Sequence, residues 1–418
     1  MRNVLADILP FDVETIRLDF PILNETVYGK PLVFLDNAAS SQKPQLVIET
    51  LVDYYTHYNA NIHRGVYALS QKASGAFDAV RAKVQHFINA GSELEIIFVR
   101  GTTEGINLVA ATFGRMNVHA GDEVLITAME HHSNIVPWQL LCEEKGEFLK
   151  VIPINDAGEL ILDGLDDLLT SRTKLVSLSH TSNTLGTINP LKEIIARAHA
   201  KGIPVMVDAA QGVVHDVIDV QDLDCDFLTF SSHKMCGPTG IGCLYGKLEL
   251  LEAMPPYQGG GEMIASVSFE KTTYNEVPYK FEAGTPNIAD VIGLGAAIDY
   301  YNKLDRSAAL AYEQSLLKHT TAKLAEIPEV RLIGTAAKKA SVISFVLKGI
   351  NAMDAGMYLD TMGIAVRTGQ HCTEPLMLCM GIPGTIRASF MFYNTFAEAD
   401  ALVEGVRKTV KFLTPVKS

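Results

Sequence analysis

The chain has 418 residues, of which 48% are hydrophobic and 20% charged. Those values are typical of a globular protein, and the length is sufficient for two domains. The formal net charge of −13 argues against nucleic acid as a main partner, because phosphate backbones select basic surfaces. No apolar run approaches a membrane span in length, and acidic residues interrupt the N-terminal segment, so we expect neither a membrane partner nor a secretion signal.

The six cysteines include no CxxC pair and are too sparse for a disulfide framework. We therefore expect reduced thiols and a cytoplasmic protein.

The first thirty or so residues have the pattern of an amphipathic helix followed by a loop at Pro21 and Gly29-Lys30-Pro31. Short apolar runs then alternate with helical patterns, such as Asn134–Lys145 and Leu191–His199. This alternation predicts a mainly parallel sheet covered on both faces. The last two runs are too close together for a crossover helix, so we predict that they pair antiparallel. The predicted strands are Glu95–Arg100, Glu123–Thr127, Phe148–Ile154, Lys174–Ser179, Ile203–Asp208, Asp226–Phe230 and Gly240–Tyr245.

The pattern predicts an α/β fold with three parts. Residues 1–30 form an N-terminal segment that packs on a small domain, residues 31–295 form the large domain, and residues 296–418 form the small C-terminal α/β domain. A long helical pattern at Asp290–Leu304 marks the transition, and strands are expected near Ala340–Leu347 and Gly384–Ser389. The glycine-led segment from Gly259 to Pro278 predicts a protruding hairpin.

Two neighbouring strands end in chemically distinctive residues. The run through Thr229 and Phe230 ends in two serines, a histidine and Lys234, and the strand before it ends in Asp208. Pyridoxal 5′-phosphate (PLP) needs an amine for its aldehyde and a carboxylate beside its pyridine nitrogen. Taken alone, Lys234 and Asp208 also fit a solvent-exposed lysine beside a capping aspartate.

The segment Gly101-Thr102-Thr103 follows another strand and opens a helix. Glycine, two hydroxyls and a helix N-terminus suit a phosphate, although an ordinary threonine cap has the same pattern. Ser231 and His233 could donate to the same phosphate. Gln211, three residues past Asp208, could donate to the phenolic oxygen of the cofactor.

Polar residues end two further strands. In Glu130-His131-His132, one histidine could lie flat on the pyridine ring and exchange protons. A metal site is the alternative, but adjacent histidines lack the i, i+4 spacing of a helical zinc motif, so we expect no metal. Asn183 could bind the cofactor or a substrate carboxylate. Ligands of open α/β sheets bind at such carboxyl ends.

The segment Arg367-Thr368-Gly369-Gln370-His371-Cys372 is the second chemical signal. Cys372 follows glycine and polar residues, and the neighbouring His371 could favour its thiolate, although most lone cysteines are buried packing. Arg387 lies within a predicted strand. Its guanidinium suits bidentate capture of an α-carboxylate, with a surface salt bridge as the alternative.

These motifs resemble the class V aminotransferase group of fold-type I PLP enzymes, and more closely the SufS-type (group II) cysteine desulfurases. The resemblance extends over nearly the whole chain. The short RTGxHC loop is the group II form, whereas group I enzymes carry their cysteine on a longer serine-rich loop. The matching motifs, in order, are LDNAASSQKP, NIHRGVYALS, TTEGIN, EHHSNIVPW, HTSNTLGTINP, VDAAQ, SSHKMCGPTGIG, FEAGTPN and RTGQHC.

The resemblance implies a role for each candidate residue. Lys234 would form the Schiff base, Asp208 would pair with the pyridinium, and Cys372 would be the nucleophile. The others would stack on the ring (His131), hold the phosphate (Thr102, Thr103, Ser231, His233 and, from the neighbouring subunit, Thr285), or bind the substrate carboxylate (Arg387, Asn183 and, across the interface, Arg64).

The resemblance also implies an activity and partners. L-Cysteine would be converted to L-alanine, and its sulfur would pass through a persulfide to an acceptor protein of iron–sulfur cluster assembly. The enzyme would be a homodimer. A selenocysteine lyase, an aminotransferase of the same fold and a non-catalytic scaffold are the alternatives.

Overall fold

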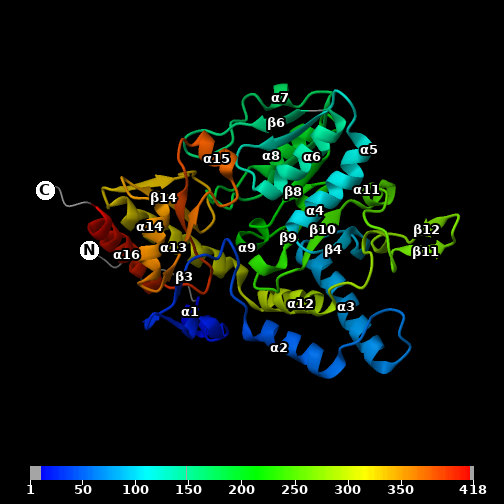
Figure 1. Ribbon diagram of the computed structural model, residues 1–418, viewed down its shortest axis with the longest axis horizontal. Helices are drawn as coiled ribbons and strands as arrows, with labels where there is room; N and C mark the ends of the chain where they lie inside the picture. Colours follow the sequence, from blue (N-terminus) through cyan, green and yellow to red (C-terminus); the bar gives the residue numbers. More distant parts are fainter. Residues whose placement is uncertain (1–10, 147, 415–418) are drawn as a thin grey trace.

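The computed structural model describes residues 11–146 and 148–414. A seven-stranded sheet in the order β4-β10-β9-β8-β7-β5-β6 forms its centre (Figure 1). β10 runs antiparallel to both neighbours, and the other pairs are parallel. All seven predicted strands and the antiparallel pair are therefore confirmed. Their bounds are β4 (Ile96–Val99), β5 (Glu123–Thr127), β6 (Phe148–Ile152), β7 (Thr173–Ser179), β8 (Val205–Asp208), β9 (Phe227–Ser231) and β10 (Gly242–Gly246).

Successive residues of the strands face opposite layers of the large domain. In β4, Ile96 and Phe98 belong to the core on one face of the sheet (Figure 1). The helices of that core are α3 (Ala68–Phe87), α8 (Leu191–His199) and α12 (Ile288–Lys303). Ile97 and Val99 join the opposite core, under α4 (Thr102–Val109) and α6 (Val136–Lys145). A sheet buried on both faces explains why its strands read as nearly continuous apolar runs.

The small domain is built on a second sheet, in the order β13-β14-β17-β16. Its strands are β13 (Val330–Ile333), β14 (Val342–Leu347), β16 (Arg367–Gly369) and β17 (Thr385–Ser389), all paired antiparallel. They share a core with α13 (Arg306–Ala325), α14 (Ala352–Asp360) and α16 (Phe396–Leu413). The predicted α/β architecture, with a large and a smaller C-terminal domain, is confirmed, while the domain limits at residues 31 and 296 stay predictions.

A strand near the N-terminus pairs with a strand of the small domain, although the two are far apart in the sequence. β3 (Val33–Phe34) pairs in parallel with β15 (Ile364–Ala365). Immediately after β3, Asp36 forms an isolated parallel bridge with Ser389 in β17. Residues at the start of the chain therefore lie against the small-domain sheet.

The amphipathic helix expected before the loop at Pro21 lies partly outside the described residues, which begin at residue 11. Within the described residues, α1 (Val13–Arg17) has only five residues and is followed by a 3-10 turn that starts at Pro21. Proline disfavours the helical conformation of the residue before it, and Phe20 is non-helical, with φ of −113° and ψ of 87°. β1 (Thr26–Val27) and β2 (Lys30–Pro31) then form a small hairpin.

The predicted hairpin after Gly259 is confirmed. β11 (Ile264–Val267) and β12 (Thr272–Tyr274) pair antiparallel and project from the end of the molecule opposite the small domain (Figure 1). The remaining helices are α2 (Gln45–Asp53), α5 (Arg115–Asn117), α7 (Leu165–Leu168), α9 (Gly212–His215), α10 (Val220–Leu223), α11 (Leu248–Ala253) and α15 (Glu374–Cys379). Within the described residues, no helix combines the length and apolarity that crossing a membrane requires.

The packing of α4 on β9 gives a stability test at two helical glycines. A Cβ on Gly105 would collide with Thr229 Oγ1, which is fixed by its hydrogen bond to the Cys243 carbonyl (2.9 Å). We expect Gly105→Ala to lower the free energy of unfolding by about 1–3 kcal/mol through overpacking. Gly75→Ala in α3 is the matched control: a Cβ there meets nothing within 4 Å, so it should stabilise by about 0.5–1 kcal/mol. Thermal unfolding of both variants checks this, and equal shifts would contradict the close approach of α4 and β9.

Candidate active site

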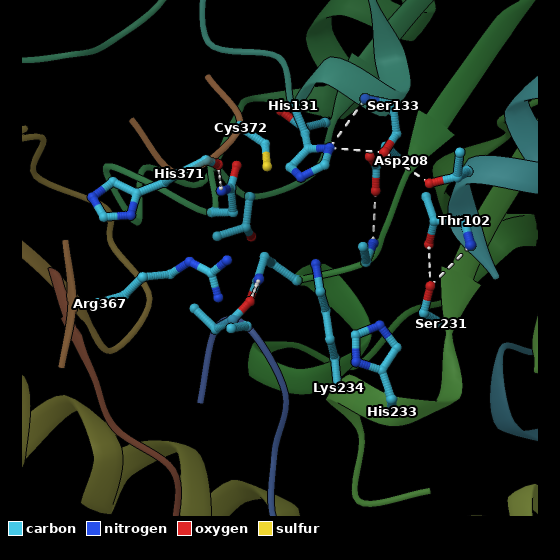
Figure 2. A pocket seen from close by; sticks show the side chains of 18 of the residues that line it. Thr102, His131, Ser133, Asp208, Ser231, His233, Lys234, Arg367, His371 and Cys372 are labelled. Atoms are coloured by element: carbon cyan, nitrogen blue, oxygen red, sulfur yellow. Dashed lines mark hydrogen bonds between the residues drawn. The ribbon is translucent and has the colours of Figure 1, made fainter. Parts of the chain in front are cut away.

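A pocket of about 190 Å³ lies where the carboxyl ends of the large-domain strands meet the small domain (Figure 2). It brings together most of the candidate residues, which come from five strand ends of the large sheet and from two segments of the small domain. Those that line it are Thr102, Thr103, His131, Asn183, Asp208, Gln211, Ser231, His233, Lys234, Cys372 and Arg387.

Asp208 and Lys234 form the floor of the pocket. The Asp208 carboxylate is buried and accepts a hydrogen bond from the Ala210 N–H (2.9 Å). Burial raises the pKa of Asp208, and the charge of Lys234 opposes the shift. For Lys234, burial lowers the pKa to about 8, and Asp208 opposes this. At pH 7 about a tenth of the Lys234 amine would therefore be unprotonated and nucleophilic, far more than for a lysine of ordinary pKa.

A cluster of hydroxyls stands at the N-terminus of α4. Ser231 Oγ accepts a hydrogen bond from the Thr102 N–H (2.9 Å) and also bonds to Thr102 Oγ1 (2.9 Å). Thr103 Oγ1 bonds to Ser133 Oγ (2.9 Å). The residue before α4, Gly101, provides no side-chain cap, so the helix end is open to an anion. Hydroxyls and a helix N-terminus together suit a phosphate.

The two adjacent histidines have different positions. The His131 ring lines the pocket, and burial lowers its pKa to about 3, so the ring is neutral. Its Nδ1 accepts a hydrogen bond from the Ser133 N–H (3.0 Å), which leaves the ring proton on Nε2. His132 instead anchors the cysteine loop: its N–H donates to the Cys372 carbonyl (2.8 Å), and its Nε2 accepts from the Glu374 N–H (3.1 Å).

Cys372 is exposed, and Figure 2 shows its sulfur directed towards the space beside His131. His371 and Cys372 both have left-handed backbone conformations, with φ of 53° and 58°. Such residues cost about 1–3 kcal/mol each and persist only where surrounding contacts hold them. Here Asn183 Nδ2 donates to the His371 carbonyl (2.9 Å). The loop is thus held in a strained shape from the large domain.

The expectation that His371 favours the thiolate is not supported. Its ring is buried beside Thr385, with 2.8 Å between Nε2 and the hydroxyl oxygen. Burial, helped by the charges of Arg387 and Arg367, lowers the pKa of His371 to about 3. A neutral imidazole supplies no positive charge to a neighbouring thiolate. Adjacency in sequence did not reveal that the His371 ring is buried away from the sulfur.

Arg387 is buried in β17 with 2% of its side chain exposed, so the surface salt bridge is wrong for this residue. Its Nη1 donates to the Asn183 carbonyl (3.0 Å), and its Nη2 donates to Asp36 Oδ1 (2.8 Å). Arg367 also lines the pocket. Sequence reasoning missed Asp36 and Arg367, although both stand in the quoted motifs LDNAASSQKP and RTGQHC.

Two candidates lie outside this pocket. Thr285 lines a separate cavity of about 440 Å³ with Tyr257 and Asn287. Arg64 is largely exposed and pairs with Glu262 (2.8 Å). Both were expected to act on a neighbouring subunit, so their roles stay predictions. In the part of the chain that the structure describes, no three His, Cys, Asp or Glu side chains cluster as metal ligands would.

Comparison with known proteins places this geometry in a family. The model of the family Aminotransferase class-V matches residues 33–402. The chain belongs to the class V aminotransferase family. It is 53% identical over 403 residues to a cysteine desulfurase of Synechococcus elongatus, covering 96% of this chain but only 64% of that protein. It is also 53% identical over 401 residues to a cysteine desulfurase of Enterobacter sp., covering 96% of this chain and 98% of that protein.

The fold is shared with a solved structure of this family. The crystal structure of the Escherichia coli cysteine desulfurase CsdA, in an S-sulfonic acid form, superposes with a TM-score of 0.91 and 40% sequence identity. The match covers 97% of this chain and all of that one (100%).

PLP is the cofactor of this class V enzyme, and the residues of the pocket fit it. Asp208 presents a buried carboxylate that accepts a hydrogen bond from the backbone N–H of Ala210, and this suits a protonated pyridine nitrogen. Lys234 presents an amine of lowered pKa for the aldehyde. The hydroxyls of Thr102, Thr103 and Ser231 stand at the N-terminus of α4 for the phosphate.

The lowered pKa of Lys234 predicts how the apoenzyme takes up its cofactor. Only the unprotonated amine attacks an aldehyde, so the rate of covalent PLP attachment should rise with pH to a plateau, with its midpoint near pH 8. A lysine of ordinary pKa would give a rate that still climbs towards pH 10.5. Stopped-flow absorbance of apoenzyme mixed with PLP measures this. A rate that keeps rising above pH 9.5 would contradict the desolvated amine, and Lys234→Ala gives the baseline without covalent attachment.

Proposed function

We propose that the chain is a PLP-dependent cysteine desulfurase, which converts L-cysteine to L-alanine and retains the sulfur as a persulfide on Cys372. The observation that carries this proposal is a thiol, an amine and a buried guanidinium on one small pocket: Cys372, Lys234 and Arg387. The names of the relatives at 53% identity point the same way.

Arg387 and Asn183 would hold the α-carboxylate of the substrate. Arg387 is fixed in β17, and its guanidinium faces the pocket. The amide of Asn183 is oriented by its bond to the His371 carbonyl (2.9 Å). Capture of the carboxylate between these groups would place the substrate side chain towards Cys372.

When bound, PLP supplies an electron sink that acidifies the α-carbon and weakens the substrate Cβ–Sγ bond. Lys234 would remove the proton from the α-carbon, which its lowered pKa permits near neutral pH. Asp208 would keep a negative charge beside the pyridine nitrogen. His131, neutral and protonated on Nε2, would carry protons within the pocket.

The sulfur-transfer step would need no reactants other than the Cys372 thiol and the substrate. The Cys372 thiolate attacks the substrate sulfur, so that an S–S bond forms while the Cβ–S bond breaks. The electron pair of the broken bond stays with the carbon fragment, which gains a proton and leaves as L-alanine. No external oxidant or reductant is required, because cysteine and thiol yield alanine and persulfide.

We further propose a homodimer of the group II type in the cytoplasm, which delivers sulfur to an acceptor protein of iron–sulfur cluster assembly. The short loop that carries Cys372 and the exposure of that residue support delivery to another protein. The second cavity, which contains Thr285, supports a contribution to the partner's phosphate site. No disulfide joins the cysteines of the described residues, as a reducing compartment requires.

Replacement of one thiol tests the proposed activity. In Cys372→Ala we expect sulfide and alanine release from L-cysteine, with a reductant present, to fall by at least about a hundredfold, because no group remains to accept sulfur. PLP absorbance should persist. Cys379→Ala, which removes the other exposed cysteine, is the matched control and should keep full activity.

Two outcomes of this experiment would redirect the assignment. Activity on L-cysteine that survives in Cys372→Ala would contradict the role of this thiol. Activity of the unchanged enzyme seen with L-selenocysteine alone would favour the selenocysteine lyase.

A further inference from the structure

Two arginines lie side by side on neighbouring strands of the small-domain sheet. Arg367 in β16 and Arg387 in β17 are direct partners in the antiparallel pairing, so their side chains project from the same face. Like charges directly opposite one another destabilise a sheet. Arg387 is also buried, which makes an unbalanced charge more costly. The pair therefore needs an anion between its guanidinium groups.

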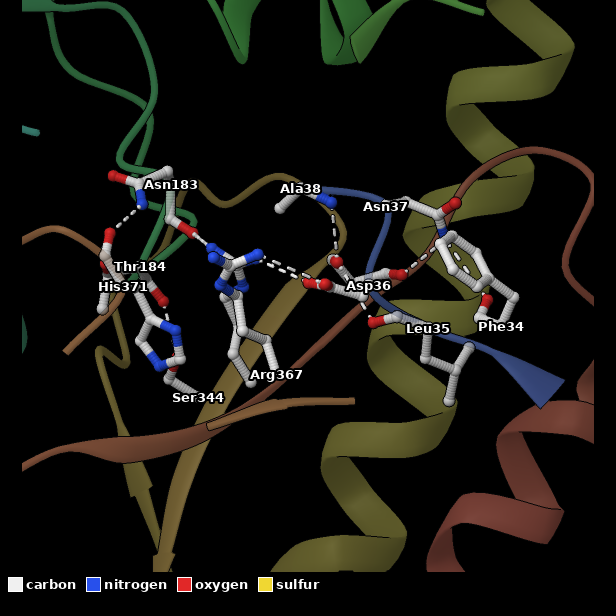
Figure 3. Close-up of polar contacts among 12 residues, drawn as sticks. Phe34, Leu35, Asp36, Asn37, Ala38, Asn183, Thr184, Ser344, Arg367 and His371 are labelled. Atoms are coloured by element: carbon white, nitrogen blue, oxygen red, sulfur yellow. Dashed lines mark hydrogen bonds and ion pairs between the residues drawn. The ribbon is translucent and has the colours of Figure 1, made fainter. Parts of the chain in front are cut away.

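Asp36 supplies one such anion and bridges the pair (Figure 3). Its Oδ1 lies 2.8 Å from Arg387 Nη2, and its Oδ2 lies 3.5 Å from Arg367 Nη1. Each carboxylate oxygen therefore serves a different guanidinium.

The backbone around Asp36 is held firmly. The Ser389 N–H donates to the Leu35 carbonyl (2.7 Å), and the Ala38 N–H donates to Ser389 Oγ (2.8 Å). These bonds fix the chain on either side of Asp36 against the end of β17. The carboxylate is thus placed by the N-terminal segment and not by the arginines themselves.

The bridge leaves donors of Arg387 available. Its hydrogen bonds go to Asn183 and Asp36, and its buried Nε has no partner among the described residues. Two arginines and one aspartate carry a net charge of +1. A single α-carboxylate would neutralise the cluster and could use the remaining N–H groups without displacing Asp36.

We propose that Asp36 is a positioning residue for substrate binding: by bridging Arg387 and Arg367 it orients the guanidinium of Arg387 and sets the charge of the site to accept one α-carboxylate. Asp36 acts through the two arginines and does not itself contact the substrate. This inference rests on the proposed function only in taking an α-amino acid as the ligand.

The test compares ligands with and without a carboxylate on the holoenzyme. L-Alanine and L-alaninamide are titrated into the unchanged enzyme and into Asp36→Asn, with the PLP absorbance and calorimetry as readouts. We expect the preference for L-alanine, expressed as the ratio of the two Kd values, to fall about tenfold in Asp36→Asn, the effect of losing one charge-assisted contact. General damage to the pocket would weaken both ligands alike and leave this ratio unchanged.

An unchanged ratio would overturn the proposal. A larger preference for L-alanine in Asp36→Asn would also overturn it, because Asp36 would then merely compete with the substrate for Arg387. Asp400→Asn removes a carboxylate that pairs with Lys323 (2.6 Å) outside the pocket, so it should leave the ratio as it is. Thermal unfolding of each variant controls for stability.

A double variant separates charge from folding. Asp36→Asn with Arg367→Gln restores the net charge of +1 and removes the repulsion, so it should recover part of the preference lost in Asp36→Asn. A preference lower than in the single variant would show that Asp36 does not act through Arg367. If the proposed desulfurase activity were wrong, the result would differ. L-Alanine would still bind with the expected preference over L-alaninamide, but L-cysteine would yield no sulfide.

Discussion

The in-register parallel pairing of β7, β8 and β9 is the constraint on which the site depends. Ser179 pairs with Asp208, and Asp208 pairs with Thr229, so β7 and β8 end level with each other while β9 continues to Ser231. This register sets the Asp208 carboxylate and the Lys234 amine in one buried space. Isolated charges are costly there, and a cofactor with a protonated ring nitrogen and an aldehyde compensates both groups.

The other half of the site depends on the small sheet. β16 and β17 carry the two pocket arginines, and the loop that leaves β16 carries the thiol. This pair of adjacent strands therefore relates the position of the carboxylate-binding group to that of the sulfur acceptor. Its alignment with the large domain depends on contacts made by residues at opposite ends of the chain, Asp36 and Arg387 among them.

The large sheet could be predicted from the sequence, because strands buried on both faces are continuous apolar runs. Several of these runs are followed directly by polar residues. The grouping of Lys234, Asp208 and Thr102 followed from that regularity. Asp36 was not found, since its function comes from a bridge to β17 more than three hundred residues away. His371 was misjudged because its burial beside Thr385 is a tertiary property. The loop at Pro21 could be predicted, because proline disfavours the helical conformation of the residue before it.

The ties between the cysteine loop and the large domain also limit the conformations available to the enzyme. Hydrogen bonds join His132 to Cys372 and Glu374, Asn183 to His371, and Thr184 to Thr373 (2.8–3.1 Å). At about 1 kcal/mol each, they favour the closed arrangement by several kcal/mol. A conformer with the small domain swung away would then have a population on the order of 1% or less. The exposed thiol of Cys372, which lines the pocket, marks a route for substrate and product that needs no separation of the two domains.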